Sequence, residues 1–144
     1  MKKLLLLGVL VMFMCFFTGT IFAESNVPDL KGKWQSKTYT HHHEKDGFFT
    51  NSKANGQWII KEQHGRLFSG ERTYIKVQVS KDKITEGFSG VISKNGKRIY
   101  MVDHNEDILF GDILADGSIE LVLMNDGDES HNSKIGLMEL ERVK

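Results

Sequence analysis

From residue 32 onward, apolar and polar residues alternate in short runs separated by glycine-containing turns. The alternation has the period of two that is typical of strands with one buried face. Asn-Gly and Asp-Gly pairs are strong hairpin signals, because both central residues of such turns need positive φ. The turn pairs are Asn55-Gly56, His64-Gly65, Asn95-Gly96, Asp116-Gly117 and Asp126-Gly127. The pattern predicts a meander of hairpins.

Eight strands are expected, at about residues 32–40, 57–63, 66–79, 83–93, 98–104, 107–114, 118–125 and 134–143. No window of about eleven residues keeps an apolar period of 3.6, so helix should be minor. The third and fourth runs are long, which suits the tilted strands of a closed barrel better than those of a sandwich. We therefore expect an all-β fold, a single eight-stranded antiparallel up-and-down barrel.

The first 23 residues have the pattern of a secretory signal peptide. Lys2 and Lys3 form a positive start, residues 4–17 are an apolar core, and Ala23 offers a small residue for cleavage. An uncleaved membrane anchor is the alternative, since apolar residues continue intermittently to Phe22. Cleavage is favoured because a polar, charged stretch follows at once. The predicted domains are a signal peptide (1–23) and a barrel (24–144), in an exported protein that is periplasmic or secreted.

The charge balance excludes some partners. The 144 residues hold 19 Lys plus Arg and 19 Asp plus Glu, without a basic block, which argues against nucleic acid. Removing residues 1–23 takes away two lysines, leaving 17 positive against 19 negative side chains, and removes Cys15, the single cysteine. The mature domain, with no membrane span, must therefore be held together by its core without a disulfide.

The first and last predicted strands carry two residues that could contact each other. Trp34 lies in the first strand, after Gly32-Lys33, and Arg142 lies in the last strand. If these strands pair, the guanidinium can stack on the indole, a desolvated cation–π contact worth about 1 to 2 kcal/mol. The alternative is an unrelated core tryptophan and a surface arginine.

These residues resemble the calycin superfamily of small barrels, which includes lipocalins, fatty-acid-binding proteins and avidins, and avidin-like proteins are similar in length and rhythm. The matching elements are Gly32-Lys33-Trp34, Phe68-Ser69-Gly70, Phe88-Ser89-Gly90, Phe110-Gly111-Asp112, Asp116-Gly117 and Lys134-Ile135-Gly136-Leu137 leading to Arg142. The resemblance implies a barrel that binds a ligand and often assembles into oligomers.

The same resemblance argues against biotin. Ser36 falls where avidins place a polar ligand contact, but Arg72 lies where a polar or aromatic contact is usual. Met138 takes the place of the Asn or Asp that bonds the ureido group, and the later pocket tryptophans are missing. A site loses discrimination when a hydrogen-bonding group is replaced by a thioether.

Alternation defines an expected interior that is apolar except for one cation. The inward residues are Trp34, Trp58, Ile60, Phe68, Arg72, Phe88, Ile92, Val122 and Met138. Arg72 would suit the anionic end of an amphipathic ligand, because guanidinium pairs well with carboxylates. The alternative is a filled barrel in which Arg72 pairs with Glu62 or another carboxylate. Strand 98–104 directs inward either Ile99, Met101 and Asp103, or Tyr100, Val102 and His104.

The histidines of residues 41–43 are the remaining candidates. His41 and His43 share one side of an extended segment and could bind Zn²⁺ or Cu²⁺ with Glu44 or Asp46 nearby. Alternatively, residues 41–54 form a polar loop at the barrel mouth that contacts a partner. No Gly-x-Ser-x-Gly, His-Glu-x-x-His or phosphate-binding glycine loop occurs, so we expect no enzyme and no cofactor.

Three functions follow from this sequence. The first is an exported carrier of a small apolar or amphipathic ligand, held by Trp58, Phe68, Phe88 and Met138 and oriented by Ser36 and Arg72. The second is a solid barrel whose loops bind or inhibit an envelope or secreted protein. The third is metal capture at His41 and His43.

Overall fold

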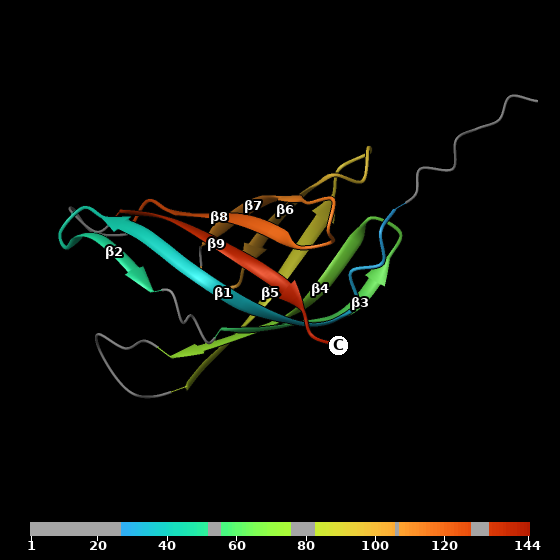
Figure 1. The fold of residues 1–144 in the computed structure, drawn as a ribbon, viewed down its shortest axis with the longest axis horizontal. Helices are drawn as coiled ribbons and strands as arrows, with labels where there is room; N and C mark the ends of the chain where they lie inside the picture. Colours follow the sequence, from blue (N-terminus) through green and yellow to red (C-terminus); the bar gives the residue numbers. More distant parts are fainter. Residues whose placement is uncertain (1–26, 52–55, 76–82, 106, 128–132) are drawn as a thin grey trace, which may run out of the picture.

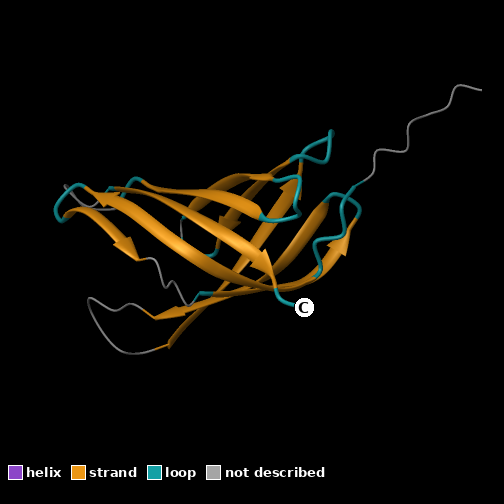
Figure 2. Ribbon diagram, viewed as in Figure 1, coloured by secondary structure: helices purple, strands orange, loops and turns teal. Residues whose placement is uncertain are grey.

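The computed structural model describes residues 27–51, 56–75, 83–105, 107–127 and 133–144. Within these ranges all regular structure is strand, and none of it is a helix that could span a membrane (Figure 2). The strands are β1 (Gly32–His43), β2 (Gly47–Asn51), β3 (Gln57–His64), β4 (Leu67–Ile75), β5 (Lys83–Ile92), β6 (Arg98–Asp103), β7 (Ile108–Ile113), β8 (Ile119–Asn125) and β9 (Lys134–Arg142). The predicted signal peptide, with Cys15, and His131 lie outside the described residues.

Eight of these strands form the expected closed antiparallel barrel. Neighbours along the chain pair from β3 to β9, and β9 then pairs with β1, so that the two ends of the domain lie together (Figure 1). Closure leaves few unpaired backbone groups at sheet edges, where aggregation starts. The prediction of an all-β, eight-stranded barrel is confirmed.

Strand β2 is an addition to the barrel that the sequence pattern did not indicate. The first part of β1, from Gly32 to Gln35, pairs with β3, whereas its second part, from Tyr39 to His43, pairs with β2. Gly47, with φ of 75°, allows the tight turn between β1 and β2. The expectation of a loop from residue 41 is therefore wrong as far as residue 51, and residues 52–55 lie outside the described part.

The predicted Phe-Ser-Gly elements have a packing role. Phe68 on β4 lies opposite Gly90 on β5, and Gly70 lies opposite Phe88. A Cβ atom on Gly90 would lie 2.3 Å from the Phe68 ring, and one on Gly70 would lie 2.6 Å from the Phe88 ring. Each phenylalanine therefore needs the glycine across from it, and the two rings meet edge to face with their centroids 6.4 Å apart.

Buried apolar side chains fill the inside of the barrel. They are Leu30, Trp34, Trp58, Ile60, Phe68, Phe88, Ile92, Ile99, Met101, Leu109, Ile119, Leu121, Leu123, Met138 and Leu140. Strand β6 directs Ile99, Met101 and Asp103 inward, which settles the alternative left open by the sequence. The inward placement of Val122 was wrong, because Leu121 and Leu123 take the inner positions of β8 and Val122 lies on the outer face.

The segment before β1 closes one end of the barrel, which we call the floor. The Trp34 indole N–H donates to the Leu30 carbonyl at 2.9 Å, and the Gln63 side chain bonds the backbone of both Pro28 and Leu30. Arg142 lies directly opposite Trp34, with its guanidinium 5.0 Å from the ring centroid, so the predicted pair is confirmed. Because Arg142 is exposed, the contact is worth only about 0.5 to 1 kcal/mol, less than expected.

At the opposite end, the mouth, the barrel wall is less continuous. Strand β5 pairs with β6 only from Phe88 to Ile92, whereas its earlier residues pair with β4 alone. One further backbone bond joins His104 N–H to the Gly87 carbonyl at 3.0 Å. The β1–β2 hairpin and the β4–β5 pair diverge at this end, on the left of Figure 1. Side chains must therefore hold this seam between β5 and β6.

Candidate functional site

A buried arginine with three carboxylates lies inside the mouth. Arg72 of β4 is only 6% exposed. Its Nε donates to Glu86 Oε2 at 2.9 Å, and its Nη2 donates to Asp107 Oδ2 at 2.7 Å and also to Asp103. Glu86 comes from β5, Asp103 from the end of β6 and Asp107 from the turn before β7. These four residues, here the Arg72 cluster, bridge the seam.

Further donors, most of them neutral, contact the other oxygens of Glu86 and Asp107. The Tyr74 hydroxyl and the Asn105 amide donate to Glu86 Oε1 at 2.8 and 2.7 Å. The Asn125 amide donates to Asp107 Oδ1 at 2.6 Å, and Lys134 Nζ lies 3.6 Å from the same oxygen. Buried carboxylates are stable only with such partners, so the network is built to keep charge inside the mouth.

Backbone donors hold Asp103 in place. Its Oδ1 accepts the N–H groups of Asn105 at 3.0 Å and Asp107 at 2.8 Å. The turn between β6 and β7 is thereby fixed around this carboxylate, an arrangement in which an Asp side chain mimics a backbone turn. Its other oxygen remains directed at Arg72.

The carboxyl groups respond differently to burial. Burial alone would raise the pKa of Glu86, but hydrogen bonds from Tyr74 and Asn105 and the charge of Arg72 lower it below the ordinary value. In Asp107, bonds from Arg72 and Asn125 likewise outweigh burial and lower the pKa. In Asp103, burial outweighs Arg72 and raises the pKa. Glu86 and Asp107 are therefore the more firmly ionised members.

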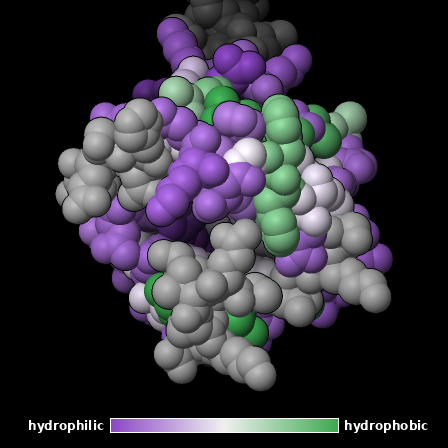
Figure 3. Space-filling view, turned by 90° about the vertical axis from the view of Figure 1, so that its left-hand side faces the viewer, coloured by the Kyte–Doolittle hydropathy of each residue, from purple (hydrophilic) through white to green (hydrophobic). Residues whose placement is uncertain are grey.

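Aromatic rings surround the guanidinium. The Arg72 Cζ lies 5.6 Å from the Trp58 ring centroid and 5.2 Å from that of Tyr74, distances at which a ring face attracts a cation. Burial, followed by the nearby charge of Asp107, raises the pKa of Tyr39, so this tyrosine is neutral. Figure 3 looks onto this end of the molecule and shows it to be mainly hydrophilic. The ring faces and the carboxylates of the Arg72 cluster together favour a cation at the mouth.

The expectation that Arg72 awaits an anionic ligand does not fit these contacts. Its guanidinium is already bonded to the three carboxylates, as the alternative of internal pairing proposed. Glu62 is not among these partners, because it is exposed and lines the outer face of the barrel. The carboxylates that do pair were missed, although alternation gave a signal: Glu86 and Asp103 hold inward positions beside Phe88 and Met101.

The other predicted ligand residues also face the interior. Trp58 and Phe88 pack with ring centroids 5.4 Å apart, and Phe68 adjoins Phe88. Ser36 is buried, and its hydroxyl accepts the Trp58 indole N–H at 3.2 Å. Met138 is buried on β9, opposite Tyr39 of β1. The structure therefore brings Ser36, Trp58, Phe68, Arg72, Phe88 and Met138 together inside the barrel, packed against one another.

The two candidate metal ligands lie on the β1–β2 hairpin. The His41 ring packs against Tyr39 and Phe49, with centroids 5.0 and 5.1 Å away. His43 Nδ1 accepts the backbone N–H groups of Lys45 and Asp46 at 3.2 and 3.3 Å. Within the described ranges, no three His, Cys, Asp or Glu side chains are placed to hold a metal ion.

His41 has an unusual ring nitrogen. Its Nδ1 is buried and has no hydrogen-bond partner among the residues that the structure describes. Burial, with the charges of His43 and Lys134, lowers its pKa, so the ring is neutral near pH 7. A buried polar atom without a partner needs a physical explanation, and one such explanation is a bound ligand.

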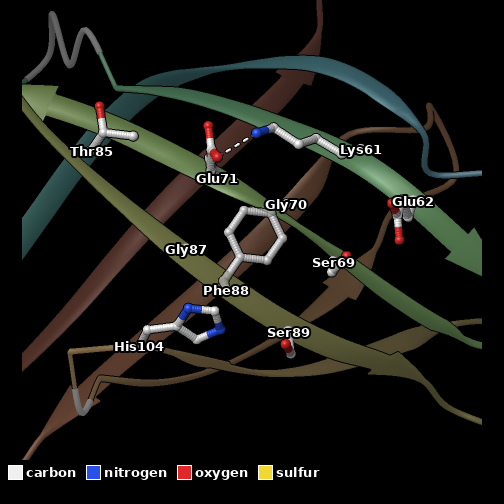
Figure 4. Close-up of a pocket in the computed structure, with 10 residues that line it drawn as sticks. All are labelled: Lys61, Glu62, Ser69, Gly70, Glu71, Thr85, Gly87, Phe88, Ser89 and His104. Carbon is white, nitrogen blue, oxygen red and sulfur yellow. Dashed lines mark hydrogen bonds and ion pairs between the residues drawn. The ribbon is translucent and has the colours of Figure 1, made fainter.

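A second, shallower depression lies on the outside of the barrel. It has a volume of about 370 Å³ and runs over β3, β4 and β5. Figure 4 shows the Lys61–Glu71 ion pair on one side of it and His104 on the other, with hydroxyls between them. The hydroxyls belong to Ser69, Thr85 and Ser89. No sequence pattern predicted this groove, and its polar lining is that of an ordinary solvated sheet face.

Comparison with known proteins identifies the fold. Among solved structures, one described as EF1p2_mFAP2b bound to DFHBI is similar, with a TM-score of 0.54 and 15% identity, over 79% of this chain and 94% of that chain. No protein-family model matches the sequence, and no curated protein does. The likeness defines the class: a small closed antiparallel β-barrel, with which the calycin-like resemblance is consistent.

Proposed function

We propose that this chain is an exported, non-enzymatic binding protein that takes a small amphipathic ligand at the barrel mouth. The cationic or N–H-donating end of the ligand would face the Arg72 cluster. The observation that supports this is the charge count inside the mouth, where three carboxylates from three segments converge on a single guanidinium.

The charge count reverses the ligand polarity expected from the sequence. With all three carboxyls ionised, the cluster has two negative charges more than Arg72 balances, and Lys134 offsets one of them. An anionic ligand group would meet repulsion here, whereas an ammonium or amidinium group would be attracted. The ligand class that fits is therefore a small amine-bearing amphiphile.

The surroundings of the cluster suit such a ligand. The rings of Tyr39, Trp58 and Tyr74 supply apolar and π surface, and the His41 Nδ1 at the same end has no partner among the described residues. Because side chains fill the interior, the ligand would lie at the mouth, above that core. The similar solved barrel is described as bound to DFHBI, which supports a binding role for the fold.

The test is a comparison of two ten-carbon amphiphiles whose head groups have opposite charge. Decylamine should raise the melting temperature of the purified protein and decanoate should not, because a ligand stabilises the state that binds it. Glu86→Gln should reduce the shift, while Glu71→Gln, on the outer face, should leave it unchanged. Equal shifts with both ligands, or a larger one with decanoate, would contradict the proposal.

A second candidate is the protein-binding module. The supporting observation is Phe48 of β2, which is 85% exposed at the tip of the β1–β2 hairpin. Large apolar side chains exposed to this degree are typical of contact surfaces. Its signature would be a complex of the whole chain with a second protein, lost on Phe48→Ser, in place of a small bound molecule.

A further inference from the structure

The outer face of the barrel carries apolar side chains in two rows that cross four strands. The strand register aligns Val102 with Ile108, Met124 and Ile135 in one row, and Tyr100 with Phe110, Val122 and Leu137 in the next. Residues directly opposite one another on a sheet face are in side-chain contact. These eight residues, here the apolar band, therefore form one continuous surface over β6, β7, β8 and β9.

Most of the apolar band is open to solvent. Six of its members, all except Phe110 and Val122, are between 44% and 57% exposed. The band continues onto the β1–β2 hairpin, where His42 lies opposite Ile135 and meets Phe48 edge to face, with 4.6 Å between centroids. The groove over β3, β4 and β5 is lined by charged side chains and hydroxyls. Beside that groove, exposed Leu67 of β4 continues the Tyr100 row through Val91, so the apolar surface is concentrated over β6 to β9 and extends to this residue.

The area of the apolar band is close to that of one half of a small protein interface. Aromatic side chains bury roughly 150 to 250 Å² each and aliphatic ones less, so these six half-exposed residues, of which Tyr100 is aromatic, present roughly 300 to 500 Å². The largest apolar patch on a typical monomer is about 300 to 600 Å², and a small specific interface takes about 600 Å² from each partner. With Phe48 and Leu67 added, the surface approaches that lower size.

The charges around the band do not oppose self-association. They lie in the adjoining row, where Arg98, Asp112, Glu120 and Glu139 are aligned across the same four strands. Arg98 bonds both carboxylate oxygens of Asp112 at 2.8 and 3.0 Å. The processed chain has 17 positive against 19 negative side chains, so its small net charge is a weak barrier to association of two copies.

We infer that a second copy of this chain covers the apolar band in a two-fold symmetric dimer, with sheet packed on sheet. A four-stranded apolar sheet face can pack on a second copy of itself, because two sheet faces pack about 10 Å apart with strands nearly aligned. Self-complementary two-fold interfaces are the commonest form of association. The interface contains no charged residue at its centre, as dimer interfaces require.

Sedimentation equilibrium of the purified, processed protein tests this inference. The wild type should be a dimer at micromolar concentration, and Ile108→Glu and Met124→Glu should weaken self-association at least about tenfold, since each buries a charge in the interface. The control is Ile75→Glu on β4, which is 49% exposed and pairs with Lys83, outside both rows, and it should remain dimeric. A wild type that is monomeric at tens of micromolar would overturn the inference.

A second measurement holds even if the charged variants do not fold. Because Cys15 is the single cysteine and lies in the predicted signal peptide, Met124→Cys gives the processed protein one site for a spin label. Labels in a dimer should couple at short distance, since the two faces are about 10 Å apart. Ile75→Cys, outside both rows of the band, should give a distinctly longer distance. Uncoupled Met124→Cys labels, or a complex with a different protein only, would contradict the dimer.

Discussion

Arg72 is held in place by charge rather than by apolar packing. Burial alone would lower its pKa, but bonds and charges from Asp107, Asp103 and Glu86 raise it, so the guanidinium stays ionised inside the mouth. Removing one partner of such a buried set is costly, because the remaining charges have lost their balance. The residue therefore governs the stability of the mouth as well as its charge.

We expect Arg72→Ala to destabilise the protein by about 3 to 5 kcal/mol, measured by urea unfolding, because three carboxylates remain without their counter-ion. Ethylguanidinium chloride should restore part of this loss, at concentrations where sodium chloride does not. The control is Lys61→Ala, which breaks an exposed ion pair with Glu71 and should cost less than about 1 kcal/mol. Equal losses of unfolding free energy in both variants would show that the Arg72 cluster stabilises the fold no more than an exposed ion pair does.

At the scale of elements, the Arg72 cluster replaces missing backbone bonds. Strand β5 leaves β6 at Phe88, and beyond the His104–Gly87 bond only side chains join the β4–β5 pair to β6 and the turn after it. The stability of the seam should therefore depend on pH, whereas that of the floor should not.

Acidification should open the seam before the rest of the barrel. The pKa values of Glu86 and Asp107 are lowered by folding, so their contribution to stability is complete above the unfolded values of about 4 and is lost as the pH falls through and below them. Asp103, with a raised pKa, acts in the opposite direction, but it is one group against two. Hydrogen exchange should show the opening free energy of the His104 amide, which donates to the Gly87 carbonyl, falling between about pH 5 and 3.

The control for this pH effect is the floor. The amide of Trp34 should keep its opening free energy over the same range, because apolar contacts and neutral hydrogen bonds hold that end. A Glu86→Gln, Asp107→Asn double variant should lose most of the pH dependence at the His104 amide. If both amides lose protection in parallel, the cluster does not hold the seam.

The strands were predictable because the turns are marked by Asn-Gly and Asp-Gly pairs and one face is apolar. Strand β2 was missed although Asp46-Gly47 is such a pair, since its five residues, Gly47–Asn51, do not alternate and the preceding histidines gave no apolar signal. The phase of β8 was misjudged at Val122 for a related reason. Apolar residues occur on both faces of Ile119–Asn125, because the outer face carries the apolar band, and alternation then cannot tell inside from outside.

At the scale of the whole molecule, the two barrel ends differ in kind. The floor is closed by the lead-in segment under Trp34, whereas the mouth holds buried charge. Arg72 was accessible to sequence reasoning because it interrupts an apolar face. Alternation could also have placed Glu86 and Asp103 inside, but it could not show that they pair with Arg72, since Glu86, Asp103 and Asp107 lie 14, 31 and 35 residues away along the chain and the barrel brings them together.

Native mass spectrometry of the protein, purified from the cells that produce it, tests whether the mouth binds a small cationic amphiphile. We expect a small amine-bearing molecule to be retained on the chain and to be lost from the Glu86→Gln, Asp107→Asn variant. Its retention by Glu71→Gln would serve as the matched control. A bare chain, or a bound molecule with an anionic end, would contradict the claim.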